Sequence, residues 1–194
     1  MAVSKTRNLL VDVARRLFAQ NGFENTSMNE IAQQANKGRR TLYTYFKSKE
    51  DIYNTVIQSE LKRLFESLDE VANKDIPPEE KMVQLIFIHL EAVKEIVNRN
   101  GNLRAEFFRN IWRVEQVRKT FDRSEITVFR RVLNEGVDKG QFDLNNVKFT
   151  AELIHYCLKG CETPYIYGHL AVNQDELHVF VHRLVRRSIG HSYM

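Results

Sequence analysis

The chain has 194 residues, 43% of them hydrophobic and 28% charged, a composition that excludes a disordered or fibrous protein. Its longest aliphatic or aromatic run is residues 85–88, far short of the roughly 20 apolar residues of a membrane helix. The N-terminal residues contain no apolar signal-peptide core, so we expect a cytoplasmic protein. The net charge of +4 arises wholly in residues 1–53, where nine Lys and Arg face five Asp and Glu, whereas residues 54–194 hold twenty of each. This division predicts an N-terminal module that binds a polyanion.

Two helices are predicted at the start of the chain. Residues 5–21 form the first, which ends where Gly22 can take the positive φ of a helix C-cap. Ser27 and Glu30 then form a capping box, in which a hydroxyl and a carboxylate each accept a hydrogen bond from an orphan amide at the start of the second helix. Helical spacing gives that helix a narrow apolar stripe of Met28, Ile31, Ala32 and Ala35. With the next helix, these elements are expected to bury Leu17, Phe18, Phe23, Ile31, Leu42 and Phe46.

A sharp turn is predicted before a third helix that begins at Arg39, because Asn36 and Gly38 both tolerate positive φ. Leu42 and Phe46 lie four residues apart and share the inward face of this helix. Its outward face is basic, hydroxylic and aromatic, and consists of Arg39, Arg40, Tyr43, Thr44 and Tyr45. Arginine forks match guanine edges or phosphate oxygens, and hydroxyl groups donate to phosphates. The helix-turn-helix therefore has the side chains of a major-groove reader.

A second capping box, residues 48–51, opens a long helix whose N-terminal amides, with Lys49, can hold one more phosphate. Residues 7–53 as a whole resemble the DNA-binding domain of the TetR family of one-component bacterial regulators. The matching segments are LFAQNGF at 17–23, Thr26-Ser27, Ile31-Ala32 and TLYTYFKSKE at 41–50. The turn departs from the family, which usually has a glycine, an aliphatic residue and a serine where this chain has Asn36, Lys37 and Gly38. The third helix therefore lacks a serine cap, and Lys37 either contacts DNA or is solvated.

The resemblance implies an all-helical protein with a three-helix DNA-binding domain at residues 1–50, joined by a long helix to a ligand-binding and dimerisation bundle at residues 51–194. It also implies a repressor that binds a palindromic operator as a homodimer and is released by a small effector. The expected DNA contacts are Thr26, Ser27, Lys37, Arg39, Arg40, Thr41, Tyr43, Thr44, Tyr45 and Lys49. Two other classes are open: a helical adaptor whose helix-turn-helix binds protein, which the charge division disfavours, and an enzyme, for which no residues stand at catalytic spacing.

Four further helices are predicted at residues 48–73, 79–100, 103–114 and 116–138. The first is continuous from the DNA-reading helices into the body, so a displacement of one end can move the other. The four hold more aromatic surface than packing needs: Phe65, Phe87, His89, Phe107, Phe108, Trp112 and Phe129. We interpret these residues as the lining of an apolar effector pocket, although all seven also suit an ordinary core. His89 is either the polar anchor of that pocket or a satisfied core histidine.

The last two predicted helices, residues 146–167 and 174–188, each carry apolar residues on two faces. One face can pack on the bundle, and the other is typical of a self-association surface, which the TetR family makes from its last two long helices. Pro164 removes an amide and is expected to kink or end the first of them. The predicted dimer residues are Ile154, Leu158, Cys161, Tyr165, Leu177, Phe180, Val181 and Leu184.

The sequence contains no motif for another chemistry, so we predict no catalytic residue, no cofactor and no metal site. Cys157 and Cys161 could form a thiol or metal sensor, but we interpret them as small buried apolar residues. His178 and His182 lie four residues apart and could hold a metal on one helix face, but we interpret them as a solvated pair.

Overall fold

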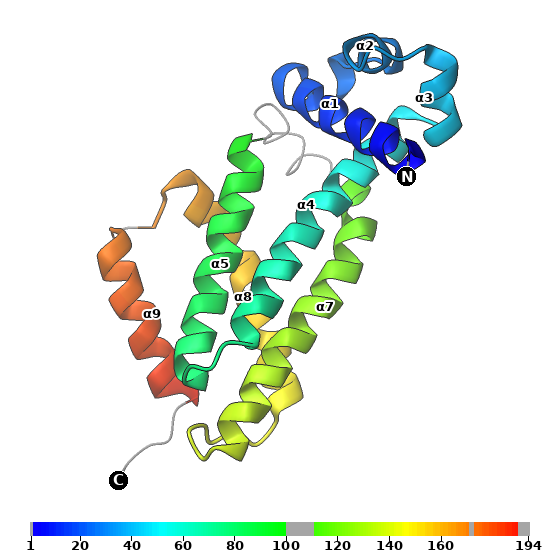
Figure 1. The fold of residues 1–194 in the computed structure, drawn as a ribbon. Helices are drawn as coiled ribbons and strands as arrows, with labels where there is room; N and C mark the ends of the chain where they lie inside the picture. The colour runs from blue at the N-terminus through cyan, green and yellow to red at the C-terminus, as the bar shows by residue number, and fades with distance from the viewer. Residues whose placement is uncertain (1, 100–110, 171–172, 190–194) are drawn as a thin grey trace. The chain divides into compact units, whose positions relative to one another are not determined.

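The structure is a computed structural model that describes residues 2–99, 111–170 and 173–189. These residues form eight helices and no strand, so the all-helical prediction is confirmed (Figure 1). The helices are α1 (Ala2–Asn25), α2 (Met28–Gln34), α3 (Arg39–Tyr45), α4 (Lys49–Ala72), α5 (Pro78–Arg99), α7 (Ile111–Asp138), α8 (Val147–Tyr167) and α9 (Gln174–Ile189). Within the described ranges, none of these helices is both long and apolar enough to cross a bilayer.

The chain divides into two compact units. The first comprises residues 1–62 and 95–119, and the second comprises residues 63–94 and 120–194. The first unit therefore extends further along α4 than the DNA-binding domain predicted at residues 1–50. Helix α4 runs without a break from one unit into the other, as the prediction of a joining helix requires.

The described core of the first unit is built from α1, α2, α3 and the start of α4. All six residues predicted to be buried by these helices are buried: Leu17, Phe18, Phe23, Ile31, Leu42 and Phe46. Tyr53 of α4 adds an aromatic cluster, because its ring lies 5.4 Å from that of Phe18 and 5.0 Å from that of Phe23. The first helix bends at Gly22, whose φ of 81° lies where only glycine is comfortable, so the predicted end of the helix is correctly placed.

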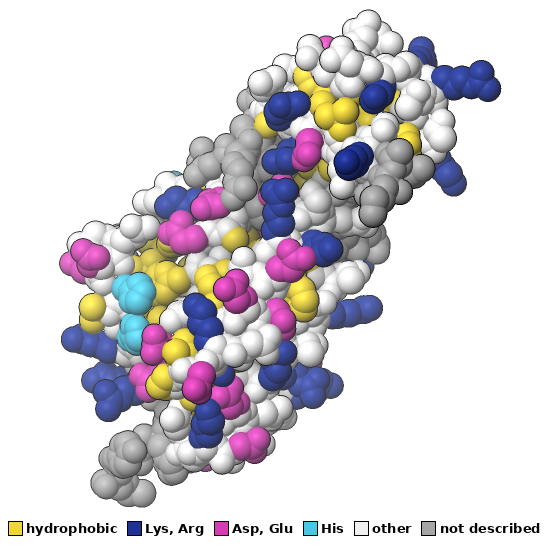
Figure 2. Space-filling view, viewed as in Figure 1, with side chains coloured by type: hydrophobic (Ala, Val, Ile, Leu, Met, Phe, Trp, Pro, Cys, Tyr) yellow, Lys and Arg dark blue, Asp and Glu magenta, His cyan; other side chains and the backbone are white. Residues whose placement is uncertain are grey.

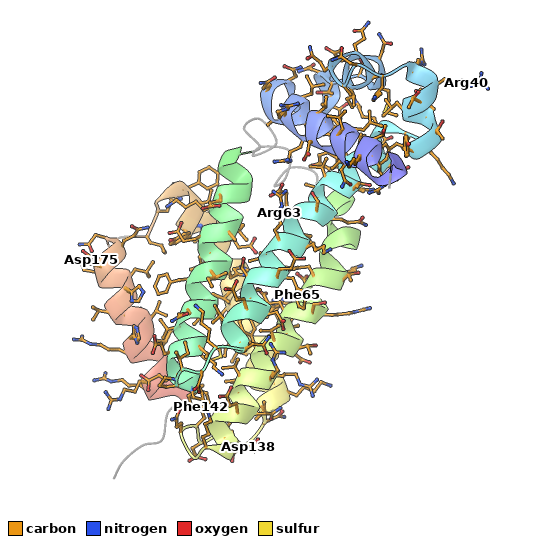
Figure 3. All side chains as sticks on the ribbon, in the orientation of Figure 1. Arg40, Arg63, Phe65, Asp138, Phe142 and Asp175 are labelled. Atoms are coloured by element: carbon orange, nitrogen blue, oxygen red, sulfur yellow. The ribbon has the colours of Figure 1, made fainter. Side chains whose placement is uncertain are left out.

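The second unit contains the remaining part of α4, most of α5 and α7, and all of α8 and α9. Helix α7 is continuous from Ile111 to Asp138, so the predicted break near residue 115 is wrong. Helix α8 continues through Pro164 for one more turn and ends at Gly168, whose φ of 67° gives a left-handed cap. Phe142, which follows α7, lies against its last turn at Gly136, where an added Cβ would stand 2.0 Å from the phenyl ring (Figure 3).

Candidate nucleic-acid interface and effector-domain sites

The start of α2 is fixed as the sequence predicts. The Ser27 hydroxyl accepts a hydrogen bond from the Glu30 amide at 3.2 Å, and the Glu30 carboxylate accepts one from the Ser27 amide at 2.8 Å. These bonds from the backbone and side chain of Ser27 hold the pKa of Glu30 below its usual value. The capping box is therefore confirmed, and it orients the helix that precedes the turn.

The turn between α2 and α3 has the geometry expected for a tight helix-turn-helix. Asn36 has a φ of 51°, and the Lys37 amide donates to the Ala32 carbonyl at 2.9 Å. Gly38 is the N-cap of α3 and offers no side-chain hydrogen bond, so the predicted loss of a cap at this helix is confirmed. Lys37 and Gly38 are both exposed.

Helix α3 presents a basic and aromatic surface. Leu42 faces inward, whereas Arg39, Arg40, Tyr43 and Thr44 are exposed. The guanidinium of Arg39 lies 5.5 Å from the centre of the Tyr43 ring, and Arg40 projects away from the helix (Figure 3). In the described part of the chain, neither arginine forms an ion pair with a carboxylate. Lys and Arg side chains lie over this unit with few acidic ones between them (Figure 2). Two forks are thus available to an incoming polyanion.

Two residues predicted to contact phosphate have other partners in the structure. Thr26 is buried, and its hydroxyl donates to the carbonyl of Gly22 at 2.8 Å. The Lys49 ammonium donates to the carbonyls of Phe23 and Glu24 at 2.6 and 3.1 Å, and lies 4.4 Å from the centre of the Phe23 ring. Both side chains therefore fasten the end of α1, and their contacts with DNA stay predictions.

The start of α4 carries a modified form of the predicted capping box. The Ser48 hydroxyl accepts from the Asp51 amide at 3.2 Å, as predicted. The Asp51 carboxylate, however, accepts from the Lys47 amide at 2.9 Å, one residue before the cap. One orphan amide of α4, that of Asp51, is thus capped, and the bond to Lys47 fixes the residue before the cap, so α4 begins at a defined point shortly after α3.

The described members of the predicted aromatic pocket lie in different surroundings. Phe65 is half-buried in a groove of about 200 Å³ that it shares with Asp69, Ser124, Thr127, Val128 and Arg131. Phe87 stacks on the ring of His178 of α9 at 4.3 Å, and Phe129 is fully buried in the core. Phe107, Phe108 and the side chain of Trp112 lie outside the described residues. The pocket therefore stays a prediction, and Phe129 is better explained by packing.

His89 belongs to a buried polar network. Its Nδ1 lies 2.6 Å from Oε1 of Glu125, and its Nε2 lies 3.2 Å from Oε1 of Glu162. The second oxygen of Glu125 lies 2.6 Å from Nδ1 of His155. All four side chains are buried, so the imidazole of His89 is a satisfied core group, the alternative that the sequence left open.

Opposite charges overcome the effect of burial in this network. Burial lowers the pKa of His89, but the neighbouring Glu125 and Glu162 raise it to about 9. Burial likewise raises the pKa of Glu125, but His89 and His155 bring it below its usual value. The network is thus an imidazolium between carboxylates. Sequence reasoning missed both glutamates, although each stands at helical spacing within an apolar stripe, Glu125 after Phe121 and Glu162 after Leu158.

Helices α8 and α9 leave an apolar surface exposed. Phe149, Leu153 and Tyr156 of α8 and Phe180 and Leu184 of α9 are each 50–64% exposed. Of the residues predicted at the dimer interface, Cys161, Phe180 and Leu184 are exposed and Ile154 and Leu177 are half-buried. Leu158, Tyr165 and Val181 are buried within the protomer. The tyrosine hydroxyl donates to Glu91. On α8, the exposed apolar face is therefore offset by about one residue from the stripe that the sequence spacing predicted.

The cysteines and the histidine pair show no sensor geometry. Cys157 and Cys161 are both exposed, so their interpretation as buried apolar residues is wrong. Partial burial and the neighbouring Cys157 raise the pKa of Cys161, which disfavours the thiolate that a redox sensor needs. His178 and His182 have ring centres 5.2 Å apart. Across the described ranges, no three His, Cys, Asp or Glu residues gather as metal ligands.

Comparison with known proteins agrees with this geometry. Residues 10–56 match the family model of bacterial regulatory proteins, tetR family. The HTH-type transcriptional regulator YhgD of Bacillus subtilis is 25% identical over 151 residues, covering 75% of this chain and 76% of that protein. A TetR/AcrR-family regulator from Thermobifida fusca has a TM-score of 0.71 at 23% identity, covering 92% and 95% of the two chains. The regulator FadR of B. subtilis in complex with stearoyl-CoA has a TM-score of 0.67 at 20% identity, covering 91% and 96%.

Proposed function

We propose that the chain is a TetR-family transcriptional regulator and not an enzyme, and that it acts as a cytoplasmic repressor that binds a palindromic operator as a homodimer and is released by a small apolar or aromatic effector. The observation that carries the proposal is the exposed face of α3. It combines two arginine forks with hydroxyl and aromatic groups on a helix that begins at Gly38 without a side-chain cap and ends where the Phe46 amide donates to the Leu42 carbonyl. Such a helix suits the major groove, where arginine reads guanine.

The DNA-binding proposal is tested with the substitutions Arg40→Ala and Lys37→Ala. Arg40→Ala should weaken operator binding by about 1–3 kcal/mol and leave binding to random DNA nearly unchanged, because a base-reading fork is lost. Lys37→Ala should weaken both DNAs alike, because a single ammonium contacts phosphate. Gel shifts at several salt concentrations are the measurement, and wild-type log K should fall with log salt with a slope of about −5 or steeper. A slope near zero would refute DNA binding.

For the dimer we propose the exposed apolar surface of α8 and α9, with Phe149, Leu153, Tyr156, Phe180 and Leu184 at its centre. Exposed apolar side chains gathered on two adjacent helices are typical of a covered interface. Leu153→Glu and Leu184→Glu should each give monomers of 22.8 kDa in sedimentation experiments, because a carboxylate in an apolar interface is unpaired. The matched control is Val137→Glu, a 37% exposed apolar residue on α7, which should stay dimeric. Wild-type monomers at micromolar concentration would contradict the proposal.

For the effector we propose a molecule with a large apolar part, and long-chain acyl-CoA, whose acyl chain is apolar, is the first class to test. Two observations support this choice: the half-buried aromatic side chains of the second unit, and the stearoyl-CoA bound by the structurally similar FadR. The probes are stearoyl-CoA, stearate and CoA alone, titrated by fluorescence of Trp112, the only tryptophan of the chain. An effector must bind the free protein more tightly than it binds the operator complex. By thermodynamic linkage, the ratio of these two affinities equals the factor by which the effector weakens DNA binding. A probe that binds both forms equally is no effector.

A further inference from the structure

A third guanidinium lies beside the DNA-reading helix, and it comes from α1. The Cζ atom of Arg7, near the start of α1, lies 5.3 Å from the centre of the Phe46 ring. Phe46 is the C-cap residue of α3, so Arg7 stands at the end of that helix opposite Lys37. Figure 1 shows the start of α1 beside the segment that leaves α3. The DNA contacts expected from the sequence include no residue of α1, because Arg7 and Phe46 are 39 residues apart in the chain.

The guanidinium of Arg7 is held in place and still open to a ligand. Phe46 is buried, whereas Arg7 is exposed, so the ring covers part of the guanidinium and solvent reaches the rest. In the described part of the chain, no carboxylate forms an ion pair with Arg7. An aromatic ring is a weak acceptor, so the N–H fork keeps its capacity for a phosphate. Because the ring already restrains the side chain, less conformational entropy is lost when a ligand binds.

The acidic side chains of residues 5–53 are engaged with other groups. Asp12 pairs with an arginine of α1, Glu30 closes the capping box of α2, and Asp51 accepts from the Lys47 amide. The remaining two glutamates of this segment also have partners. The side chain of Lys47, which follows Phe46 directly, is exposed like that of Arg7. Positive charge therefore gathers at this end of α3, where it attracts a polyanion.

We propose that Arg7 contacts a DNA phosphate, positioned by the Phe46 ring, and that Arg7 and Lys37 bracket the reading helix. The inference rests on the DNA-binding function proposed above. Helix α3 has seven residues and is therefore about 10 Å long. Cations at its two ends thus stand apart by roughly the width of the major groove, about 12 Å. With α3 in the groove, each cation meets a phosphate, and two such contacts fix the position of the helix on the duplex.

The same contact has a purely structural reading, in which Arg7 only covers the ring of Phe46. The salt dependence of DNA binding separates the two. A phosphate contact releases counterions, and each one contributes about 0.9 to the slope of log K against log salt. A side chain that only covers a ring contributes to folding stability and nothing to this slope.

The test measures binding of the full-length protein to a random-sequence duplex of about 30 base pairs, long enough for two half-sites one helical turn apart. Random DNA is sufficient, because phosphate contacts carry no sequence information. Fluorescence anisotropy between about 50 and 200 mM salt gives the slope. In Arg7→Gln the slope should be shallower by about 0.9 for each bound protomer, and a dimer should bind at least about tenfold more weakly at 0.1 M salt. Arg7→Lys should keep the wild-type slope, because the charge remains.

Arg16→Gln is the matched control. Arg16 is also an exposed arginine of α1, and nine residues at about 100° each place it on the side of the helix opposite Arg7. It removes the same charge, so its slope and affinity should stay close to those of the wild type. Circular dichroism checks that each variant is folded. Arg7→Met, which still covers the ring, is the second neutral variant if Arg7→Gln does not fold.

The possible failures are distinguishable. A wild-type slope in Arg7→Gln or Arg7→Met overturns the phosphate contact, even if affinity falls, because the side chain then acts through Phe46. Equal changes in Arg7→Gln and Arg16→Gln also overturn it, because net charge alone then explains the loss. A wild-type protein whose own slope is near zero overturns the proposed DNA-binding function, and this inference with it.

Discussion

Substitution of Lys49 can distinguish a structural role of this side chain from a role in contacting DNA. The contacts of its ammonium group predict the structural role. In Lys49→Met the aliphatic stem remains, but the carbonyls of Phe23 and Glu24 lose their hydrogen bonds at 2.6 and 3.1 Å. The Phe23 ring also loses the ammonium that lies 4.4 Å from its centre. All three contacts tie α4 to the end of α1, so we expect the first unit to be destabilised.

The magnitude follows from these contacts. A hydrogen bond to a charged donor contributes about 1.5–3 kcal/mol when buried, and the cation–π contact about 0.5–1 kcal/mol at an exposed site. Because Lys49 is half-buried and water can replace part of each bond, we expect a total near 2 kcal/mol. With a urea m-value of about 2 kcal/mol/M, the unfolding midpoint should fall by roughly 1 M.

The matched control is Lys37→Met, because Lys37 is exposed and, among the described residues, its hydrogen bond is made by its backbone amide. Its free energy of unfolding should change by less than about 0.5 kcal/mol, whereas its affinity for every DNA should fall. Urea unfolding followed by circular dichroism, with filter binding of operator and random DNA under native conditions, gives both quantities. If Lys49→Met keeps the wild-type midpoint and loses as much DNA affinity as Lys37→Met, our assignment of Lys49 is refuted.

Three further outcomes are expected from unfolding measurements. Gly136→Ala should lose about 1–3 kcal/mol, because its Cβ would meet the Phe142 ring, whereas Gly160→Ala, which meets nothing within 4 Å, should be neutral or stabilising. Gly38→Ser should gain about 0.5 kcal/mol, because it caps α3 and its Cβ meets only a hydroxyl 3.9 Å away. The pKa of His89 is raised from 6.5 to about 9, so its stabilising contribution is complete below pH 6.5 and is lost as pH rises through 9. The urea midpoint of the wild type should therefore fall as the pH is raised from 6 to 10. The midpoint of His89→Met should change less over the same range.

Local features of the first unit were predictable from sequence because their partners lie close along the chain. The capping box joins residues three apart, Gly22 and Asn36 adopt positive φ where the pattern requires a turn, and the six core residues follow helical spacing. The positions of Thr26 and Lys49 were not predictable in this way. A hydroxyl or an ammonium can serve a phosphate or a carbonyl, and the nearest carbonyl to Lys49 lies 26 residues earlier in the chain.

The polar network of the second unit shows the same limit more strongly. His89 was recognisable as a polar residue on an apolar helix, but its partners lie 36 and 73 residues away. On α8, spacing placed Ile154 and Cys161 on the apolar stripe predicted for the dimer interface and did not single out His155 and Glu162, which are buried in the structure. Apolarity was a poor guide to the inward face there, because a charged residue is buried once a partner on another helix neutralises it.

The two described cores differ in a way that suits their tasks. The first unit is held by apolar and aromatic contacts, which resist deformation and keep the reading helix at a fixed angle to α1 and α2. The second unit has His89, Glu125, His155 and Glu162 at the centre of its packing. Replacing such a group of charges by apolar side chains is often neutral or stabilising, so stability alone does not explain it. Its hydrogen bonds are directional, so they specify which faces of α5, α7 and α8 pack together, a selectivity that apolar contacts alone do not give.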